Sequence, residues 1–451
     1  MKTKATTSRA STSRGAATEA IQLGDRVRQL RSAAGLTQSD LAGDRFSKEY
    51  VSQIERGKTR PTRETIEWLA ARLGVDAGFL ASGVAADERG RLEAALARAE
   101  ALYQAGEDIE AVSAFDSLVA AARVTGSPEL QVRALVGTGR AKMRVSDHRV
   151  ALELFTEARG LAEAGSFSDV ERADVLLMLG ACRFQLNSTQ SAIALFGEGL
   201  ALAERSGMPC DALKADLYSW RARCWRRQRD YEAARDDVER ALELAQGVDD
   251  LRTIGVAYFQ ASLVADRQGH WVLARTYAER AREAYAQIAD RVHVGDLTNN
   301  LGGLNFLLGK TDDAIALLKE AFAIGLETGR DADAGRAVSS LAQVHLRTGD
   351  PAQAEEQARH ALRLLDGRVD YIDEVGNAQV VLGRALLELG RLDEAEAAFR
   401  DAEVSFAELG SASHRATVWV ARGDLAAKRG DHKTAADLYR SAAEALQDVR
   451  F

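Results

Sequence analysis

The stretch Leu36–Pro61, LTQSDLAGDRFSKEYVSQIERGKTRP, predicts two short helices joined by a tight connection. Thr37 can cap the first helix, and Asp40 three residues later can return the hydrogen bond as in a capping box. Ser47 can cap the second helix, and Gly57 can end it because glycine adopts the left-handed conformation without strain. The local sequence therefore predicts where both helices begin and where the second one ends.

Apolar residues recur at helical spacing along this stretch, at Leu41, Val51 and Ile54, and we expect these side chains to pack inward. A short helix that is held by a neighbour, and that has a polar face and an exposed N-terminus, can enter the major groove of double-stranded DNA. The polar side chains that this packing leaves outside are Gln38, Lys48, Glu49, Ser52 and Gln53.

The stretch resembles the helix-turn-helix domain of the phage-repressor family, also called the Cro/C1 or XRE family. The resemblance is carried by the LTQxxLA opening at Leu36, by the helix SKEYVSQIERGK from Ser47, and by LAARLGV from Leu69. It covers about Ile21 to Ser82 and implies a five-helix head that binds a specific double-stranded DNA site and regulates transcription. One departure is the turn GDRF, which is a residue shorter than the common pattern and lacks its late glycine. This turn could change the tilt of the second, reading helix.

The resemblance also implies an ion pair between Arg31 of the first helix and Glu55 of the reading helix. Breaking such a partly buried pair would leave a charge without its partner. Side chains at the exposed start of a reading helix discriminate bases, and flanking side chains hold phosphates. We therefore expect base contacts from Lys48, Glu49, Ser52 and Gln53, phosphate contacts from Thr37, Gln38, Lys58 and Arg60, and a place for Ser47 at the helix N-terminus beside the DNA.

Composition divides the rest of the chain. Residues 1–18, MKTKATTSRASTSRGAAT, contain no acid and no large apolar residue, so we expect a disordered basic tail there. An arm that touches phosphates and an organelle transit peptide have similar compositions, but an inert tail is the favoured interpretation. We expect the head over residues 19–82, a linker over 83–90 and a repeat domain over 91–451.

From Arg91 onward the sequence repeats every 40 to 42 residues. Each unit has an alanine that opens the apolar stripe of its second helix, and a small residue twelve positions earlier; eight of the nine units also have a turn-former five positions earlier. Small residues at fixed offsets let antiparallel helices pack closely, and no pair can bury its face alone. We therefore expect an all-α fold in which about nine pairs stack into a right-handed solenoid. The register alanines are Ala111, Ala151, Ala192, Ala234, Ala274, Ala314, Ala354, Ala395 and Ala435.

The repeats resemble tetratricopeptide repeats, with units of about 40 residues in place of the usual 34 or so. Their combination with the head is similar in architecture to bacterial peptide-pheromone receptor regulators. The first helix of each pair should line the inner face, where several arginines and amides fall. These groups bind carboxylates and peptide backbones, although the densest run, Ser219–Arg229, could equally face solvent or neighbouring acids. The candidate effector-binding residues are Arg140, Arg223, Arg226, Asn299, Gln343, Asn377 and Arg384.

The sequence offers no motif for catalysis, for a metal or for a cofactor. It has no complete phosphate-binding loop and no H-E-x-x-H, and its three cysteines lack the spacing of a zinc site. No apolar run is long enough to cross a membrane, and the unpaired cysteines suit a reduced cytoplasm. Residues 1–82 carry 14 Lys and Arg against 9 Asp and Glu, a net of +5, so the whole-chain charge of −8 leaves −13 for residues 83–451. A basic head on an acidic body suits DNA binding at one end of the chain.

Two hypotheses follow for the function. The leading one is a cytoplasmic transcription regulator, a homodimer that binds double-stranded DNA and whose repeats sense a peptide, a small molecule or a protein. The alternative is a protein-interaction scaffold, in which the repeats dock a partner protein and DNA binding only localises the complex. Neither hypothesis requires an enzyme activity, a membrane or a cofactor.

Overall fold

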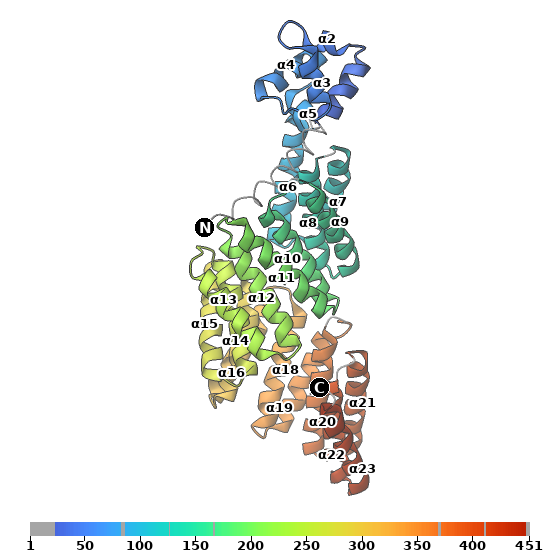
Figure 1. Ribbon diagram of the computed structural model, residues 1–451. Coiled ribbons are helices and arrows are strands. Elements are labelled where there is room, and N and C mark those ends of the chain that lie inside the picture. The colour runs from blue at the N-terminus through green and yellow to red at the C-terminus, as the bar shows by residue number, and fades with distance from the viewer. Residues whose placement is uncertain are drawn as a thin grey trace. The chain divides into compact units, whose positions relative to one another are not determined.

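The regular secondary-structure elements of the described chain are helices, joined by turns and short loops, as Figure 1 shows. No strand occurs in the described residues, which agrees with the predicted all-α class. The chain divides into two compact units, residues 1–244 and 245–451. The expected basic tail lies outside the described residues. The computed structural model describes residues 23–82, 86–125, 127–165, 167–368, 371–409 and 412–447.

Five helices form the head around one small core. The side chains predicted to pack inward, Leu41, Val51 and Ile54, are at most 1% exposed, and Val27, Leu69 and Leu80 complete the centre of the core. The first helix covers residues 23–33 of the described chain. It is followed by α2 (Gln38–Ala42), α3 (Lys48–Glu55), α4 (Arg63–Leu73) and α5 (Ala77–Ser82).

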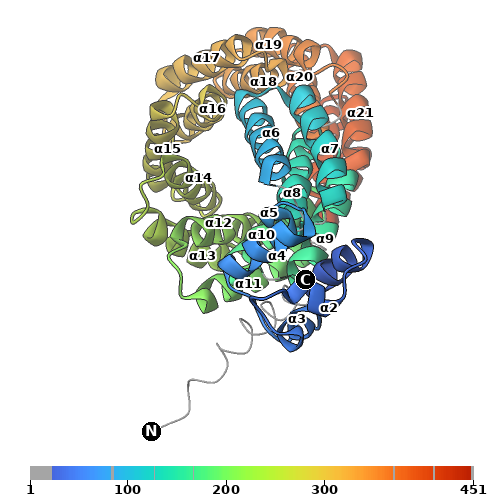
Figure 2. The same cartoon turned by 90° about the horizontal axis from the view of Figure 1, so that it is seen from above.

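Nine helix pairs follow in the described part of the chain. The first helix of the repeat domain, α6, begins at Ala86. The last five residues of the expected linker, 86–90, are therefore helical. In the second unit, the first helices α16, α18 and α20 lie in one layer and the second helices α17, α19 and α21 lie in another, as Figure 2 shows. The pairs are α6 (Ala86–Ala105) with α7 (Asp108–Thr125), α8 (Pro128–Arg144) with α9 (His148–Ala164), α10 (Asp169–Gln185) with α11 (Thr189–Ser206), α12 (Asp211–Arg227) with α13 (Tyr231–Ala245), α14 (Leu251–Arg267) with α15 (Trp271–Gln287), α16 (Arg291–Leu307) with α17 (Thr311–Glu327), α18 (Asp331–Arg347) with α19 (Pro351–Leu364), α20 (Ile372–Glu388) with α21 (Leu392–Leu409), and α22 (Ala412–Lys428) with α23 (His432–Gln447).

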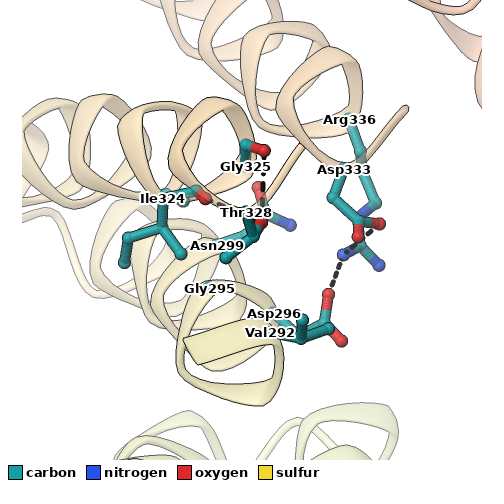
Figure 3. A pocket seen from close by; sticks show the side chains of 10 residues that line it. Val292, Gly295, Asp296, Asn299, Ile324, Gly325, Thr328, Asp333 and Arg336 are labelled. Atoms are coloured by element: carbon teal, nitrogen blue, oxygen red, sulfur yellow. Dashed lines mark hydrogen bonds and ion pairs between the residues drawn. The ribbon is translucent and has the colours of Figure 1, made fainter. Parts of the chain in front are cut away.

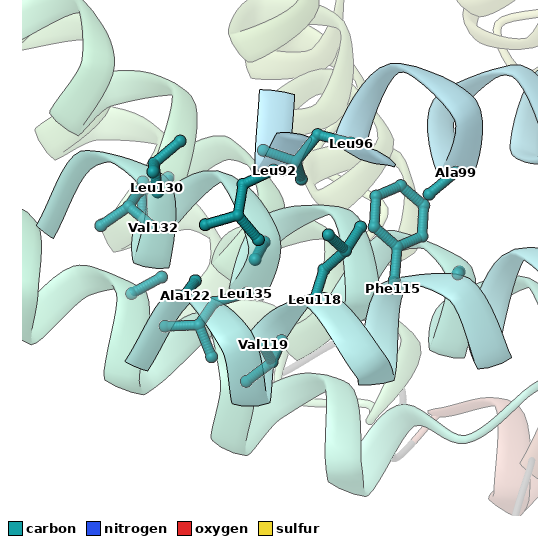
Figure 4. Close-up of a cluster of buried hydrophobic side chains, with 14 of the residues drawn as sticks. Leu92, Leu96, Ala99, Phe115, Leu118, Val119, Ala122, Leu130, Val132 and Leu135 are labelled. Atoms are coloured by element: carbon teal, nitrogen blue, oxygen red, sulfur yellow. The ribbon is translucent and has the colours of Figure 1, made fainter. Parts of the chain in front are cut away.

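Close packing inside a pair depends on the small residue of the register. In the first pair, Phe115 of α7 lies beside Ala99 of α6, within a cluster of buried leucines and valines (Figure 4). In the second pair, a Cβ added to Gly139 would come within 2.5 Å of the Phe155 ring. The ring thus fills the space that a larger side chain on the facing helix would need. The same contact recurs between Gly180 and Phe196, between Gly383 and Phe399, and between Gly423 and Tyr439.

The turn inside each pair has a left-handed residue five positions before the register alanine. Ser146, Asn187 and Arg229 adopt it with φ of 61°, 60° and 63°. This conformation costs a non-glycine residue about 1–2 kcal/mol, so the fold imposes it on Arg229, which no turn propensity predicts. The backbone N–H of Arg229 donates to the carbonyl of Arg226 at 3.1 Å and closes α12. The other six turns use glycine, at Gly106, Gly269, Gly309, Gly349, Gly390 and Gly430.

The register makes a prediction that two adjacent glycines of α16 can test. A Cβ on Gly302 would lie 2.7 Å from both Cγ and Cδ2 of the buried Leu318, whereas a Cβ on Gly303 would meet nothing within 4 Å. Gly302→Ala should lower the free energy of unfolding by about 1–3 kcal/mol through overpacking. Gly303→Ala should raise it by about 0.5–1 kcal/mol, because alanine favours the helix. Urea unfolding followed by circular dichroism measures both, and equal effects would contradict the packing argument.

Candidate nucleic-acid interface and effector surface

The start of α2 has the capping box that the sequence predicts. The hydroxyl of Thr37 accepts from the backbone N–H of Asp40 at 3.1 Å, and the Asp40 carboxylate accepts from the backbone N–H of Thr37 at 2.8 Å. The same carboxylate accepts from the Thr37 hydroxyl at 2.6 Å. These hydrogen bonds hold the pKa of Asp40 below its ordinary value. Thr37 is exposed and its side chain is oriented by the helix end.

A buried carboxylate connects α3 to the two preceding helices. Glu55 is 7% exposed, and Arg31 donates to its two oxygens from Nε at 2.5 Å and from Nη2 at 3.3 Å. Arg31 also donates from Nη1 to the Leu36 carbonyl at 2.7 Å, and its hydrogen bond to Glu55 raises the pKa of its guanidinium. Gln38 is the third donor, from Nε2 to Glu55 Oε2 at 2.7 Å. One of the two hydrogens on that amide is therefore used inside the protein, a role that the expected phosphate contact does not include.

The N-terminal half of α3 presents the side chains that were expected to face DNA. Ser47 caps the helix by accepting from the backbone N–H of Tyr50 at 3.1 Å. Lys48 and Glu49 are exposed in the first turn, and Ser52 is half-buried one turn later. The helix thus has a fixed, polar start on a buried apolar base, which is the arrangement that groove reading requires.

The remaining candidates lie in the second half of α3 and in the segment that follows it. Gln53 is exposed, and its amide oxygen accepts from the Thr59 hydroxyl at 2.9 Å, so the next loop orients this side chain. Thr59 is a positioning residue that sequence reasoning missed, because nothing in the spacing predicts this contact. Lys58 and Arg60 flank it and are exposed. Gly57 ends α3 in the left-handed conformation with φ of 65°, as expected.

Two arginines of the arginine-rich run of α12 make structural contacts. Arg221 donates to both carboxylate oxygens of the buried Asp237, at 2.8 and 2.6 Å. Arg227 donates to the Phe184 carbonyl at 3.1 Å and to the side chain of Asn187 at 2.5 Å. These contacts favour the structural alternative for two of the arginines in this run.

The three effector candidates of the first unit lie among aromatic rings or in half-buried positions. Arg140 donates to Glu100 at 3.1 Å, and its guanidinium lies 4.8 Å from the centre of the Tyr103 ring. The guanidinium of Arg223 lies 5.0 Å from the centre of the Trp220 ring and 5.5 Å from the centre of the Phe184 ring. Arg226 is half-buried.

The other four candidates belong to the second unit, where only Asn299 lines the small hollow shown in Figure 3. Its Oδ1 atom is buried and has no hydrogen-bond partner among the described residues. Arg384 is half-buried with a buried Nε that likewise lacks a partner in the described chain. Asn377 is half-buried and Gln343 is exposed.

Charged residues beside Asn299 in the hollow were missed by the sequence analysis. Arg336 of α18 forms an ion pair with Asp296 of α16, and its Nε is buried without a hydrogen-bond partner in the described residues. Asp333 accepts from the Tyr371 hydroxyl at 2.9 Å and from Arg330 Nε at 2.5 Å. Asp296 and Arg336 are 40 residues apart, one repeat period, which is the only signal that could have linked them.

Glu374 of α20 lies close enough to Arg336 for their charges to interact. Burial, reinforced by the charge of Asp373, raises the pKa of Glu374 to about 7, and Arg336 opposes the shift. A carboxyl whose pKa is raised by folding stabilises the fold fully below its unfolded pKa, and this stabilisation is lost as the pH rises through the folded pKa. The stability contributed by Glu374 should therefore fall as the pH rises from about 4.5 to about 7.

At pH 8 the Glu374→Gln variant should have a free energy of unfolding about 1–3 kcal/mol higher than that of the wild type, because the glutamine carries no charge that has to be buried. Urea unfolding measures this difference. The difference should vanish near pH 4.5. Glu388→Gln, an exposed position at the end of the same helix, is the control and should show no such pH dependence. A constant difference across the pH range would contradict the assignment.

Neither buried cysteine of the first unit is a nucleophile at neutral pH. Burial raises the pKa of Cys182 to about 11 and that of Cys224 to about 12, so both thiols stay protonated. In the described ranges no three His, Cys, Asp or Glu side chains gather as metal ligands would. None of the described helices combines the length and hydropathy needed to span a membrane.

Comparison with known protein families identifies the same two parts of the chain, the head and the repeats. Residues 22–82 match the helix-turn-helix domain family, residues 294–366 match one tetratricopeptide repeat family, and residues 136–209, 339–408 and 380–448 match another. The uncharacterized HTH-type transcriptional regulator y4dJ of Sinorhizobium fredii is 43% identical over 54 residues, which are 12% of this chain and 70% of that protein. The chain belongs to the helix-turn-helix transcriptional regulators.

A relative and a solved structure extend the likeness into the repeats. The regulatory protein AfsR of Streptomyces griseus is 28% identical over 261 residues, 57% of this chain, and the chain spans only 25% of AfsR. The crystal structure of a Rap protein complexed with competence and sporulation factor has a TM-score of 0.58 at 15% identity, over 80% of this chain and 98% of that one. At this identity the likeness shows the fold alone. The helix-turn-helix regulator thus carries a repeat domain whose fold is also found in Rap.

Proposed function

We propose that this regulator binds a specific double-stranded DNA site through α2 and α3 and controls transcription there, as XRE-type repressors do. The observation that carries the proposal is the exposed polar start of α3 on a rigid base, where Glu55 is fixed by Arg31 and Gln38. Lys48, Glu49, Ser52 and Gln53 discriminate bases in this proposal. Thr37, Gln38, Lys58 and Arg60 hold phosphates, with Ser47 at the helix N-terminus.

The protein acts as a homodimer in the cytoplasm in this proposal. A head of about 60 residues makes few base contacts, so specificity requires two heads on a two-fold-related site. The repeat domain is the larger part of the chain and supplies the contact between copies. Selection of bound sequences from random DNA at stated salt, using the full chain, is the experiment that tests the function.

Base reading and phosphate binding can be separated by two lysine variants on the selected site. Lys48→Ala should cost about 1–3 kcal/mol on the selected site and relax the preference at one base position. Lys58→Ala should weaken binding to all sequences alike and reduce the slope of log affinity against log salt by about one. Fluorescence anisotropy with specific and random duplexes measures both, and equal losses of both variants on both duplexes would refute the assignment.

We also propose that the repeat domain senses an effector. The support is the hollow of Figure 3, where a buried amide oxygen of Asn299 and a buried Nε of Arg336 lack hydrogen-bond partners among the described residues. An unpaired acceptor and an unpaired donor on residues that line the same hollow complement an amide group, so a peptide, a small amide or a protein loop fits the chemistry. Arg140, Arg223, Arg226, Gln343, Asn377 and Arg384 are further candidate contacts. The scaffold alternative is favoured instead if no effector changes DNA affinity.

An adjacent pair of asparagines provides the test. Asn299→Ala should leave DNA binding without effector unchanged and should abolish the response to a synthetic peptide pool. Asn300→Ala is the matched control, because Asn300 is not among the residues that line the hollow, and its response should equal that of the wild type. The readout is the shift in affinity for the selected duplex. A full response from Asn299→Ala would make the hollow structural.

A further inference from the structure

The short turn between α2 and α3 leaves the last turn of α2 to be fixed by another helix. Gly43 follows α2 with φ of 53° and ψ of −150°, a conformation that favours glycine. A Cβ at Gly43 would lie 3.1 Å from Arg72 Nη1 and 3.3 Å from Trp68 Cη2. Both side chains belong to α4, one helical turn apart, and they lie directly against the turn.

Arg72 binds the backbone of α2. Its Nη2 donates to the carbonyl of Asp40 at 2.7 Å, which is one of the last four carbonyls of α2, the ones that the helix itself leaves unpaired. The guanidinium lies 5.2 Å from the centre of the Trp68 ring, in cation–π geometry. The stacked ring restricts the planar group to the orientation in which it reaches the carbonyl.

Trp68 continues the contact toward the reading helix. Its ring meets Phe46 of the turn edge-on, with centroids 5.1 Å apart and planes at 85°. The ring centroid of Phe46 also lies 5.3 Å from that of Tyr50, which belongs to the first turn of α3. A continuous set of contacts therefore runs from the end of α2 through α4 and the turn to the start of α3. We call these residues, Asp40, Phe46, Tyr50, Trp68 and Arg72, the α4 clamp.

We infer that Arg72 and Trp68 are positioning residues that set the tilt of α3 and thereby the base specificity of the head. Across the turn the backbone forms one hydrogen bond, from the Phe46 N–H to the Ala42 carbonyl at 3.2 Å. The clamp adds the side-chain contacts that hold the end of α2 and the start of α3 against α4. Base contacts are more sensitive to a small rotation of α3 than phosphate contacts are, because bidentate pairing with a base edge needs defined angles. The inference rests on the proposed DNA-binding function.

The clamp and a direct phosphate contact of Arg72 make different predictions. A positioning residue changes the ratio of specific to random affinity and leaves the salt dependence on random DNA unchanged. A phosphate contact lowers both affinities together and reduces the salt slope by about one. A residue needed only for stability lowers the melting temperature and the fraction of active protein, without changing either affinity of the active molecules.

The experiment compares Arg72→Met and Trp68→Leu with Arg28→Met, an exposed arginine of the first helix that gives the same change in charge as Arg72→Met. The full-length variants are titrated to obtain the active fraction, then measured on the selected and a random duplex over a salt series. Arg72→Met and Trp68→Leu should each lower the specific-to-random ratio by about tenfold, comparable to one mismatched base pair. Arg28→Met should keep the wild-type ratio.

Several outcomes would overturn the inference. These are an unchanged ratio in both clamp variants, equal losses on both duplexes with a smaller salt slope for Arg72→Met, or a change in active fraction alone. If one variant does not fold, the other decides, because each interrupts the same set of contacts. Failure of the wild type to select any sequence would instead contradict the proposed function and leave the variants without a reference site. The two failures are therefore distinguishable.

Discussion

Two antiparallel helices can pack closely only where one of them has a small residue at the point of contact. In each repeat that point is the small residue twelve positions before the register alanine. Where this residue is a glycine, a ring or a leucine from the facing helix fills the space beside it, as Phe155 does at Gly139. The constraint fixes the offset of the two helices along each other. That offset places the left-handed turn residue, even where it is Arg229. The described repeats therefore share a small residue at the same offset in each helix pair.

The head depends on a different constraint, because its core is too small to hold α3 by apolar packing alone. Glu55 lies buried at the C-terminal end of α3 and accepts hydrogen bonds from Arg31 and Gln38. Removing either partner would leave an under-compensated charge in a nearly dry site, which is costly. The carboxylate thus joins the first helix, α2 and α3 at one point. The outer face of α3 can then carry exposed polar groups without contributing to the fold.

What could be predicted from sequence is what depends on spacing along the chain. The capping box of Thr37 and Asp40, the inward side chains of α2 and α3, and the turn positions all follow from local rules, and the structure has them. Contacts across repeats or helices could not be predicted in the same way. Gln38 reaches Glu55, and Arg336 reaches Asp296, because folding brings distant side chains together. Residues 86–90, ADERG, are the last five of the expected linker, and in the structure they form the start of α6.

The residues of the candidate site also divide into those that local sequence could identify and those that depend on contacts between helices. Position and residue type could identify the exposed start of α3, because an N-terminal helical turn outside a core is a local property. They could not identify Arg221 of α12 as a structural arginine, since its partner Asp237 lies on the next helix. They also could not reveal Arg72, whose role depends on a backbone carbonyl of α2. No sequence pattern encodes such a carbonyl, so only coordinates could show the contact.

The polar lining of the hollow needs an explanation beyond the fold. The position of Asn299, three residues before the small residue of its repeat, is Phe259 one repeat earlier and Val380 two repeats later. An apolar residue is compatible with the helix pair there, because Phe259 packs against the neighbouring apolar cluster. A buried amide oxygen without a hydrogen-bond partner, as Asn299 Oδ1 is among the described residues, costs about 1–3 kcal/mol. In the proposed effector function, a ligand in the hollow supplies this missing hydrogen bond and the stabilisation that goes with it.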